Sequence, residues 1–208
     1  MNEAGVDEAG RGSVIGPLVL ACVVFDEKGI FSLKGLVKDS KELRPQARKR
    51  LYNIIKKSAI EVKVEVLQPN VIDWAVQNLE RGLNDLEAMA TAEILSSLKH
   101  NILTAYLDSP DPIPSRYAER VQLHLRKGDI KIVASNHAES VYPHVAAASI
   151  VAKVERDREV ERLRNLYGDF GSGYPSDPKT RRYIQKVLEV DGRLPPIVRV
   201  SWRTLQRL

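Results

Sequence analysis

The sequence predicts an α/β protein in which helices cover the faces of a mixed β-sheet. Two observations support this prediction. Strand-like and helix-like segments follow one another in the order β, β, α, β, α, β, α, β, and further helices come after them. The first two strands are separated only by a short glycine-rich segment, as in a hairpin, whereas helices separate the later strands. With 208 residues, of which 43% are hydrophobic, the chain is long enough for one large domain with a packed core.

The strands are predicted from apolar runs and from alternation. Valines alternate with charged residues across residues 62–66, which indicates a half-buried strand. The first strand is short and ends at Asp7 and Glu8, and the fourth is an apolar run that is followed by Asp108. The expected strands are the opening segment up to residue 8, and residues 17–25, 62–66, 103–107 and 130–134.

The clearest helix is expected over residues 79–98, where apolar side chains recur every three or four residues along one face. A long helix begins near Pro143 and ends before Gly168, and Asp177 followed by Pro178 is typical of the start of another. The other expected helices are residues 45–58 and 115–126. We expect residues 1–165 to form the main domain, and residues 166–208 a small C-terminal helical extension packed on it.

The composition excludes several classes of protein. No apolar run reaches the roughly 20 residues of a membrane-spanning helix, and the N-terminus lacks the basic start of a secretory signal. The single cysteine, Cys22, excludes a disulfide framework, and its apolar surroundings are typical of a small buried side chain. We therefore expect a cytoplasmic protein that does not act at a membrane.

The net charge of +5 is compatible with a polyanionic partner. The basic residues gather in two tracts, which are interpreted either as solvated helix faces or as surfaces that follow a nucleic-acid backbone. The first tract is Lys38, Lys41, Arg44, Arg48, Lys49, Arg50, Lys56 and Lys57, and the second is Lys179, Arg181, Arg182, Lys186, Arg193, Arg199, Arg203 and Arg207.

Common catalytic motifs are missing from the sequence. The glycines near the N-terminus form neither a dinucleotide-binding fingerprint nor a Walker loop, and no Gly-x-Ser-x-Gly elbow is present. The four histidines lack zinc-finger spacing. His137 lies close to Glu139, although a surface or capping histidine is the default interpretation.

Acidic residues at strand ends are the remaining candidates. Hydrolysis of a phosphodiester by two divalent cations needs several carboxylates that converge from different elements. Asp7 and Glu8 are neighbours, so in a regular strand only one of them faces a given site, unless a turn or bulge at residues 9–10 relaxes that restriction. Asp108 is equally well explained as a turn-forming residue before Ser-Pro. From spacing alone a metal site is one of several possibilities.

The run Gly5-Val-Asp-Glu-Ala-Gly-Arg-Gly12, followed by Gly16-Pro-Leu-Val19, closely resembles the opening of the type 2 ribonucleases H (ribonuclease HII). Further blocks match in the family's order, and the resemblance extends from Gly5 to about Trp202. The Gly-Ser-Gly-Tyr-Pro block that begins at Gly171 and the Ser-Trp near the C-terminus resemble the archaeal and eukaryotic branch. The blocks are Asp39-Ser-Lys41, Asp108-Ser109, Tyr142-Pro-x-Val-Ala-Ala-Ala-Ser-Ile150, Ala152-Lys-Val-x-Arg-Asp157 and Gly171-Ser-Gly-Tyr-Pro-Ser-Asp-Pro178.

This resemblance implies a ribonuclease H-like fold, with a mixed five-stranded sheet flanked by helices. It also implies that Asp7, Glu8 and Asp108 are three of four carboxylates that bind Mg²⁺ or Mn²⁺ in a two-metal site. The fourth is normally an aspartate three residues before the Tyr-Pro, and here that position holds Glu139. Asp157 is a rival by type, but an ion pair on a helix surface with Lys153 is its better interpretation.

The resemblance also implies how substrate is bound. Gly10, Arg11 and Gly12 would meet the sugar-phosphate at the ribonucleotide, where glycine amides approach a 2′-OH closely and Arg11 bridges a phosphate. Tyr174 would pack on the ribose, or be an ordinary loop aromatic residue. The remaining implied contacts are Ser40, Lys41 and Lys153, of which the two lysines would hold phosphates or be solvated charges.

The implied activity is metal-dependent endonucleolytic cleavage of the RNA strand of RNA/DNA hybrids, and cleavage 5′ of ribonucleotides in duplex DNA, by a monomer. Cleavage would leave 3′-hydroxyl and 5′-phosphate ends. One rival is a non-catalytic module of the same fold that binds hybrids, and the acids at positions 7, 8 and 108 argue against it. A second rival, an ATP-binding relative of the fold, would need phosphate-binding loops that the sequence lacks.

Overall fold

The computed structural model describes residues 1–33 and 44–207, and over this part of the chain five strands form one mixed sheet in the order β3-β2-β1-β4-β5. β1 is antiparallel to β2, and β2 to β3, whereas β1–β4 and β4–β5 are parallel pairs. The expected hairpin-like opening and mixed sheet are therefore confirmed. The strands are β1 (Glu3–Ala9), β2 (Leu18–Phe25), β3 (Glu61–Leu67), β4 (Thr104–Asp108) and β5 (Lys131–Ser135).

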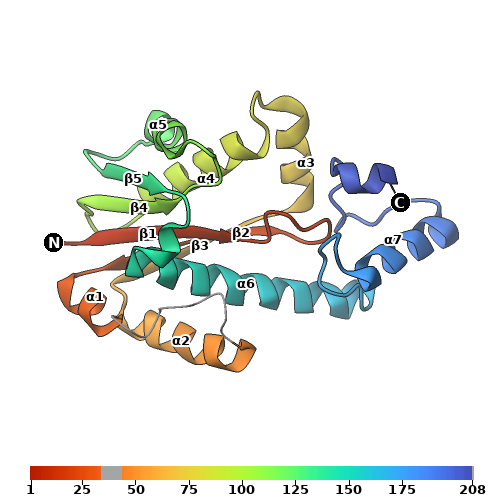
Figure 1. Cartoon of the computed structure of the whole chain (residues 1–208), viewed down its shortest axis with the longest axis horizontal. Helices are drawn as coiled ribbons and strands as arrows, with labels where there is room; N and C mark the ends of the chain where they lie inside the picture. The colour runs from red at the N-terminus through yellow and green to blue at the C-terminus, as the bar shows by residue number, and fades with distance from the viewer. Residues whose placement is uncertain (34–43, 208) are drawn as a thin grey trace.

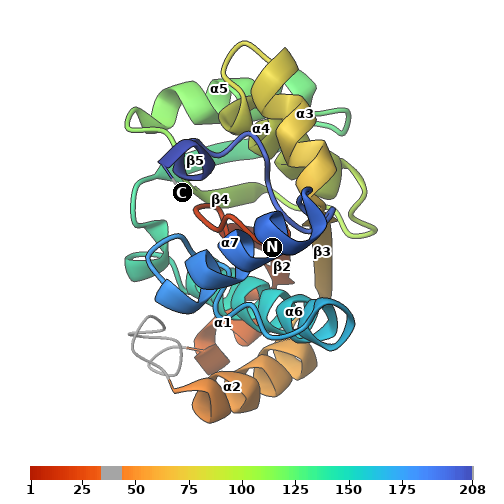
Figure 2. The same ribbon diagram turned by 90° about the vertical axis from the view of Figure 1, so that its right-hand side faces the viewer.

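Helices cover both faces of the sheet, as Figures 1 and 2 show. On one face lie α3 (Pro69–Asn78), α4 (Leu83–Ser96) and α5 (Pro114–His124). The other face is crossed by the long helix α6 (Pro143–Tyr167), with α1 (Glu27–Leu33) and α2 (Pro45–Ser58) beside it. Beyond the end of α6 lies α7 (Pro178–Asp191). None of the helices in the described part of the chain is long and apolar enough to cross a membrane.

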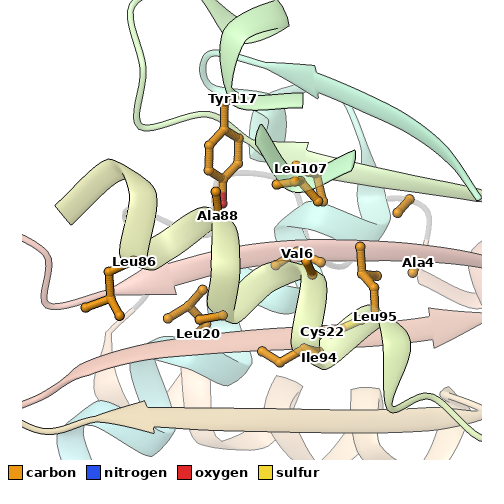
Figure 3. Close-up of a cluster of buried hydrophobic side chains, with 14 of the residues drawn as sticks. Ala4, Val6, Leu20, Cys22, Leu86, Ala88, Ile94, Leu95, Leu107 and Tyr117 are labelled. Atoms are coloured by element: carbon orange, nitrogen blue, oxygen red, sulfur yellow. The ribbon is translucent and has the colours of Figure 1, made fainter. Parts of the chain in front are cut away.

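Strand alternation divides the apolar core into two layers. Figure 3 shows Val6, Leu20 and Cys22 of the central strands in one cluster with Leu86 and Ile94 of α4. The neighbouring positions of the same strands face α6 and α2 instead. All eight residues of β2 are buried, because helices pack on both of its faces. The sheet is consequently rigid at its centre, where β1 carries the candidate acids.

Gly5 permits a close approach between β1 and the first turn of α6. A Cβ atom at this position would lie 2.2 Å from the main-chain carbon of His144 and 2.5 Å from the nitrogen of Val145. The alanines at positions 146–148 of α6 are fully or almost fully buried against the sheet. These small side chains let α6 lie directly on β1, and the helix thereby reaches the acidic residues of that strand.

Two parts of the helical prediction are wrong. The helix expected over residues 79–98 begins only at Leu83, because the chain turns at Gly82 with a φ of 55°. The apolar spacing continues across this turn because Leu79 also packs on the core, as the residue that caps α3. Neither α1 nor α3 was expected from the sequence. By contrast, α2 and α6 begin and end as predicted. The start of α7 is also as predicted, since Asp177 caps this helix by accepting a hydrogen bond from the Lys179 amide at 2.8 Å.

Candidate active site at the ends of β1 and β4

Asp7 and Asp108 lie on neighbouring parallel strands and face the same side of the sheet. The register pairs Val6 with Leu107, so the next residue along each strand is one of these acids. The core residues Val6 and Leu107 face α4, and Asp7 and Asp108 therefore face α6. Asp7 is only 6% exposed. Burial, and then the negative charge of Asp108, raise the pKa of Asp7 to about 7, although a hydrogen bond from Ser149 of α6 opposes the shift.

Glu139 joins this pair from a short 3-10 helix, η1 (Ala138–Ser140), that follows β5. The Ala138 amide donates to Asp108 Oδ1 at 2.8 Å, which fixes η1 against the end of β4. His137 begins this turn in the left-handed conformation, with a φ of 56° that is uncommon for a residue other than glycine. Burial raises the pKa of Asp108, and the adjacent Glu139 carboxyl raises it further. The structure therefore brings Asp7, Asp108 and Glu139 together, as the resemblance implied.

Glu8 belongs to the opposite face of β1. The strand pairs with β2 without interruption as far as Ala9, so no bulge turns Glu8 towards Asp7. Its side chain is directed towards α4, and the charge of Glu87 on that helix raises the pKa of Glu8 more than the charge of Asp7 or Asp108 does. Burial, followed by the charges of Glu87, Asp7 and Asp108, raises the pKa of Glu8 well above its ordinary value. The charges of Asp7 and Asp108 thus act on Glu8, although Glu8 lies on the other face of the strand.

The donor set fits a hard divalent cation. Buried carboxylates that repel one another are stabilised by an added positive charge, and Mg²⁺ and Mn²⁺ prefer oxygen ligands. Within the described residues, however, no three His, Cys, Asp or Glu side chains are already arranged around one point as metal ligands are. Binding a cation would therefore require some of these side chains to rotate.

The loop between β1 and β2 is held by two arginines, Arg199 and Arg156. Arg199, a fully buried residue near the C-terminus, donates to the main-chain carbonyls of Gly10, Arg11 and Gly16 at 2.8–3.0 Å. Gly10 has a φ of 90°, and a Cβ atom here would lie 2.4 Å from Nε of Arg156. Gly12, in contrast, has nothing within 4 Å of where its Cβ would be. The loop is therefore packed against Arg199 and Arg156 and is open to solvent at Gly12.

Tyr174 belongs to a second loop that is hydrogen-bonded to the first one. The amides of Val14 and Ile15 donate to the carbonyl of Gly173 at 2.8 and 3.1 Å. The guanidinium of Arg156 stacks on the Tyr174 ring, 4.6 Å from its centre. Arg156 thus touches both Gly10 and Tyr174, and the two segments that the resemblance assigned to the ribonucleotide lie side by side.

Of the other predicted substrate contacts, only some lie near the acidic residues. Ser40 and Lys41 lie outside the described residues. Lys153 donates to the Ser149 hydroxyl at 3.0 Å, close to Asp7. The guanidinium of Arg11 is bound to Glu87 of α4 instead of pointing into solvent. Asp157 forms a surface ion pair as expected, but its partner is Arg48 at 3.1 Å and not Lys153.

Sequence reasoning missed several buried polar residues. Arg199 was grouped with a surface tract, yet it is fully buried, because three main-chain carbonyls satisfy its guanidinium. Glu87 was not singled out, although its spacing from Leu83 and Ala90 places a charged residue on the apolar stripe of α4. That irregularity was the available signal. Ser149 and Arg156 were not singled out either, although both lie in blocks that resemble the family.

Comparisons with known proteins agree with this geometry. Residues 4–205 match the family described as Ribonuclease HII. A ribonuclease HII of Thermofilum pendens is 46% identical over 99% of this chain and 98% of its own length. The crystal structure of ribonuclease H2 from Pyrococcus horikoshii superposes with a TM-score of 0.91 at 42% identity, over 100% of this chain and 96% of that one. The structure of Bst-RNase HIII in complex with Mn²⁺ is 22% identical with a TM-score of 0.79, covers 100% of this chain and 68% of that one, and shares the fold.

A family match over nearly the whole chain, together with full-length relatives above 40% identity, confirms the resemblance found in the sequence. The ribonuclease H-like fold is confirmed by the same structures. The chain therefore belongs to the ribonuclease HII family of metal-dependent endoribonucleases, which act on RNA/DNA hybrids.

Proposed function

We propose that the protein cleaves on the 5′ side of ribonucleotides embedded in duplex DNA, in addition to the RNA strand of hybrids, and leaves 3′-hydroxyl and 5′-phosphate ends. The observation that carries the proposal is the pairing of the buried Asp7 with the half-buried Asp108, at adjacent strand positions beside Glu139. Elements from both halves of the chain converge on this point. The family membership supports the reaction class.

Asp7, Asp108 and Glu139 would hold Mg²⁺ or Mn²⁺ on one face of the strand ends. Glu8, which lies on the other face but whose pKa responds to the charges of Asp7 and Asp108, would complete the set of ligands by turning past the end of β1. Two bound cations of this kind supply an activated water and stabilise the charge on the leaving oxygen. The Mn²⁺ complex of the related Bst-RNase HIII supports the choice of metal. Hydrogen bonds from Ser149 of α6 to Asp7 and from the Ala138 amide of η1 to Asp108 would orient the two carboxylates.

Ribonucleotide recognition is assigned to the two joined loops. Main-chain amides of the Gly10-Arg11-Gly12 segment would bond to the 2′-OH, since the chain is open at Gly12. The ring of Tyr174, held by Arg156, would pack on the ribose. Ser40, Lys41 and Lys153 would contact phosphates. Residues 166–208 would then act as an extension of the main domain that carries Tyr174 to the site, and the protein would work as a monomer.

The test is cleavage of three labelled duplexes that share one sequence: a hybrid with a continuous RNA strand, a DNA duplex with one ribonucleotide, and an all-DNA duplex. We expect cleavage of the first two with Mg²⁺ or Mn²⁺, and none without metal. Mapping the products should place the cut one bond 5′ of the single ribonucleotide. Cleavage of the hybrid alone would restrict the function to long RNA strands, and products with 3′-phosphate ends would contradict the mechanism.

A further inference from the structure

Glu87 of α4 is a buried acid that the proposed mechanism does not use. Its side chain is 1% exposed, and both of its oxygens accept from Nε of Arg11, at 3.0 Å to Oε1 and 3.1 Å to Oε2. One turn earlier on the same helix, Asn84 Oδ1 accepts from Nη2 of Arg11 at 2.5 Å. Two residues of α4 therefore occupy two of the three guanidinium nitrogens.

A buried carboxylate is stable only when it is paired, and Arg11 is the cation that pairs with it. The pairing therefore has a consequence for Arg11. Burial already raises the pKa of Glu87 to about 7 against the opposing effect of Arg11, so a guanidinium that left to bind a phosphate would leave a buried carboxylate that is either unpaired or protonated. The arrangement favours an Arg11 side chain that stays on the protein when substrate arrives.

Arg11 is also fixed through its main chain. Nη1 of Arg199 donates to the Arg11 carbonyl at 2.9 Å, and the preceding carbonyl, that of Gly10, accepts from Nη2 of the same arginine at 2.8 Å. The peptide groups on both sides of Arg11 are thus held from the C-terminal segment, while its side chain is held by α4. Gly12, which follows directly, faces open space.

From these contacts we infer that Glu87 is a positioning residue for ribonucleotide recognition. It holds Arg11 on α4, and thereby orients the amides of Arg11 and Gly12 towards the 2′-OH. The Arg11 side chain is accordingly an internal anchor and not a phosphate ligand. This inference rests on the proposed function, because it assigns the support of the proposed ribose contact.

The experiment compares Glu87→Gln, Arg11→Gln and the double variant with Glu93→Gln, an exposed acid on the same helix, as the matched control. Two quantities are measured in one assay. The first is kcat/KM for the duplex with one ribonucleotide, and the second is the inhibition constant of the matched all-DNA duplex, which reports backbone contacts without the 2′-OH. Salt dependence of the inhibition constant counts the phosphate contacts.

We expect each single variant to lower kcat/KM by about tenfold or more. The inhibition constant of the all-DNA duplex and its salt slope should change by less than about twofold, since no phosphate contact is lost. The double variant should be no worse than the poorer single variant, because both remove the same pair. The Glu93→Gln control should behave as the parent enzyme.

A weaker all-DNA inhibition together with a shallower salt slope in Arg11→Gln would overturn the inference, because Arg11 would then be a phosphate ligand. Unchanged kcat/KM in Glu87→Gln would also overturn it. If Glu87→Gln does not fold, Asn84→Ala removes the outer contact to Arg11, and should cause a loss of about threefold that is again confined to the ribonucleotide substrate. Failure of the parent enzyme to cleave this substrate would instead refute the proposed function.

Discussion

Replacing Asp7 by asparagine should stabilise the metal-free protein, and the gain should depend on pH. The pKa of Asp7 is about 7, against 3.8 for the unperturbed group, because burial and the Asp108 charge oppose its ionisation. The folded protein therefore binds this proton more tightly than the unfolded chain does. Stability is retained below pH 4 and is lost as the pH rises from 4 towards 7.

The difference of about three units between the folded and unfolded pKa of Asp7 corresponds to a loss of stability of at most about 4 kcal/mol at high pH. The introduced asparagine side chain would keep an acceptor for the Ser149 hydroxyl and the Glu8 amide, so we expect a gain of about 2–4 kcal/mol at pH 8.5. For a chain of this size the melting temperature should rise by roughly 5–10 °C. At pH 4 the parent and Asp7→Asn should melt together, because protonated aspartate and asparagine are both neutral.

The assay is thermal unfolding in a metal chelator at pH 4, 7 and 8.5, with Asp129→Asn, an exposed acid, as the control. A repeat with Mg²⁺ or Mn²⁺ should stabilise the parent and not Asp7→Asn, so the difference should shrink. A variant that is less stable than the parent at pH 8.5, or a difference that does not grow with pH, would refute the idea of a repelled, buried carboxylate at this position.

Four further outcomes are expected. Glu139→Gln should cut activity strongly, whereas Glu139→Asp should retain much of it, and a metal titration in which Glu139→Gln matches the parent would make the residue a bystander. Tyr174→Ala should lose most activity on a single embedded ribonucleotide and less on a long hybrid; equal losses in cleavage assays would argue against a ribose contact. In Arg199→Lys a single nitrogen replaces the three guanidinium nitrogens that each bind a different carbonyl, and we expect a loss of about 3 kcal/mol in chemical denaturation. An unchanged midpoint would contradict this expectation. Hydrogen bonds from the Ser172 and Lys179 amides lower the pKa of Asp177 to about 2. Asp177→Ala should therefore destabilise the protein at pH 7, and by less as the pH falls towards 2, which melting curves at several pH values would check.

The sequence predicted those elements whose boundaries are set by local chemistry. Pro143 and Gly168 delimit α6, and Asp177 with Pro178 starts α7, because prolines and caps act within a few residues. The helix α4 was extended too far because Leu79 and Leu83 fit one periodic stripe although they belong to different elements. Periodicity records which side chains are buried and is insensitive to a turn between two helices that pack on the same core.

The part of the candidate site that could be predicted from the sequence also depends on local features. Asp7 and Asp108 stand at strand ends, and a parallel pairing of those strands is enough to bring them together. The family resemblance supplied Glu139 and Tyr174, whose positions depend on loops. Arg199 and Glu87 were out of reach, because a buried arginine and a buried glutamate are defined by partners more than 70 residues away in the chain. Their burial is a property of the assembled loop and not of their sequence neighbours.

Mn²⁺ titration calorimetry on the parent and on Asp108→Asn tests whether the acids at the ends of β1 and β4 form a metal centre. Cleavage of the single-ribonucleotide duplex is followed on the same samples. We expect the parent to bind Mn²⁺ and to cleave, and Asp108→Asn to bind Mn²⁺ far more weakly and to be inactive while melting no lower than the parent. Cleavage by Asp108→Asn at a rate near that of the parent, with Mn²⁺ binding intact, would contradict the assignment of this metal centre.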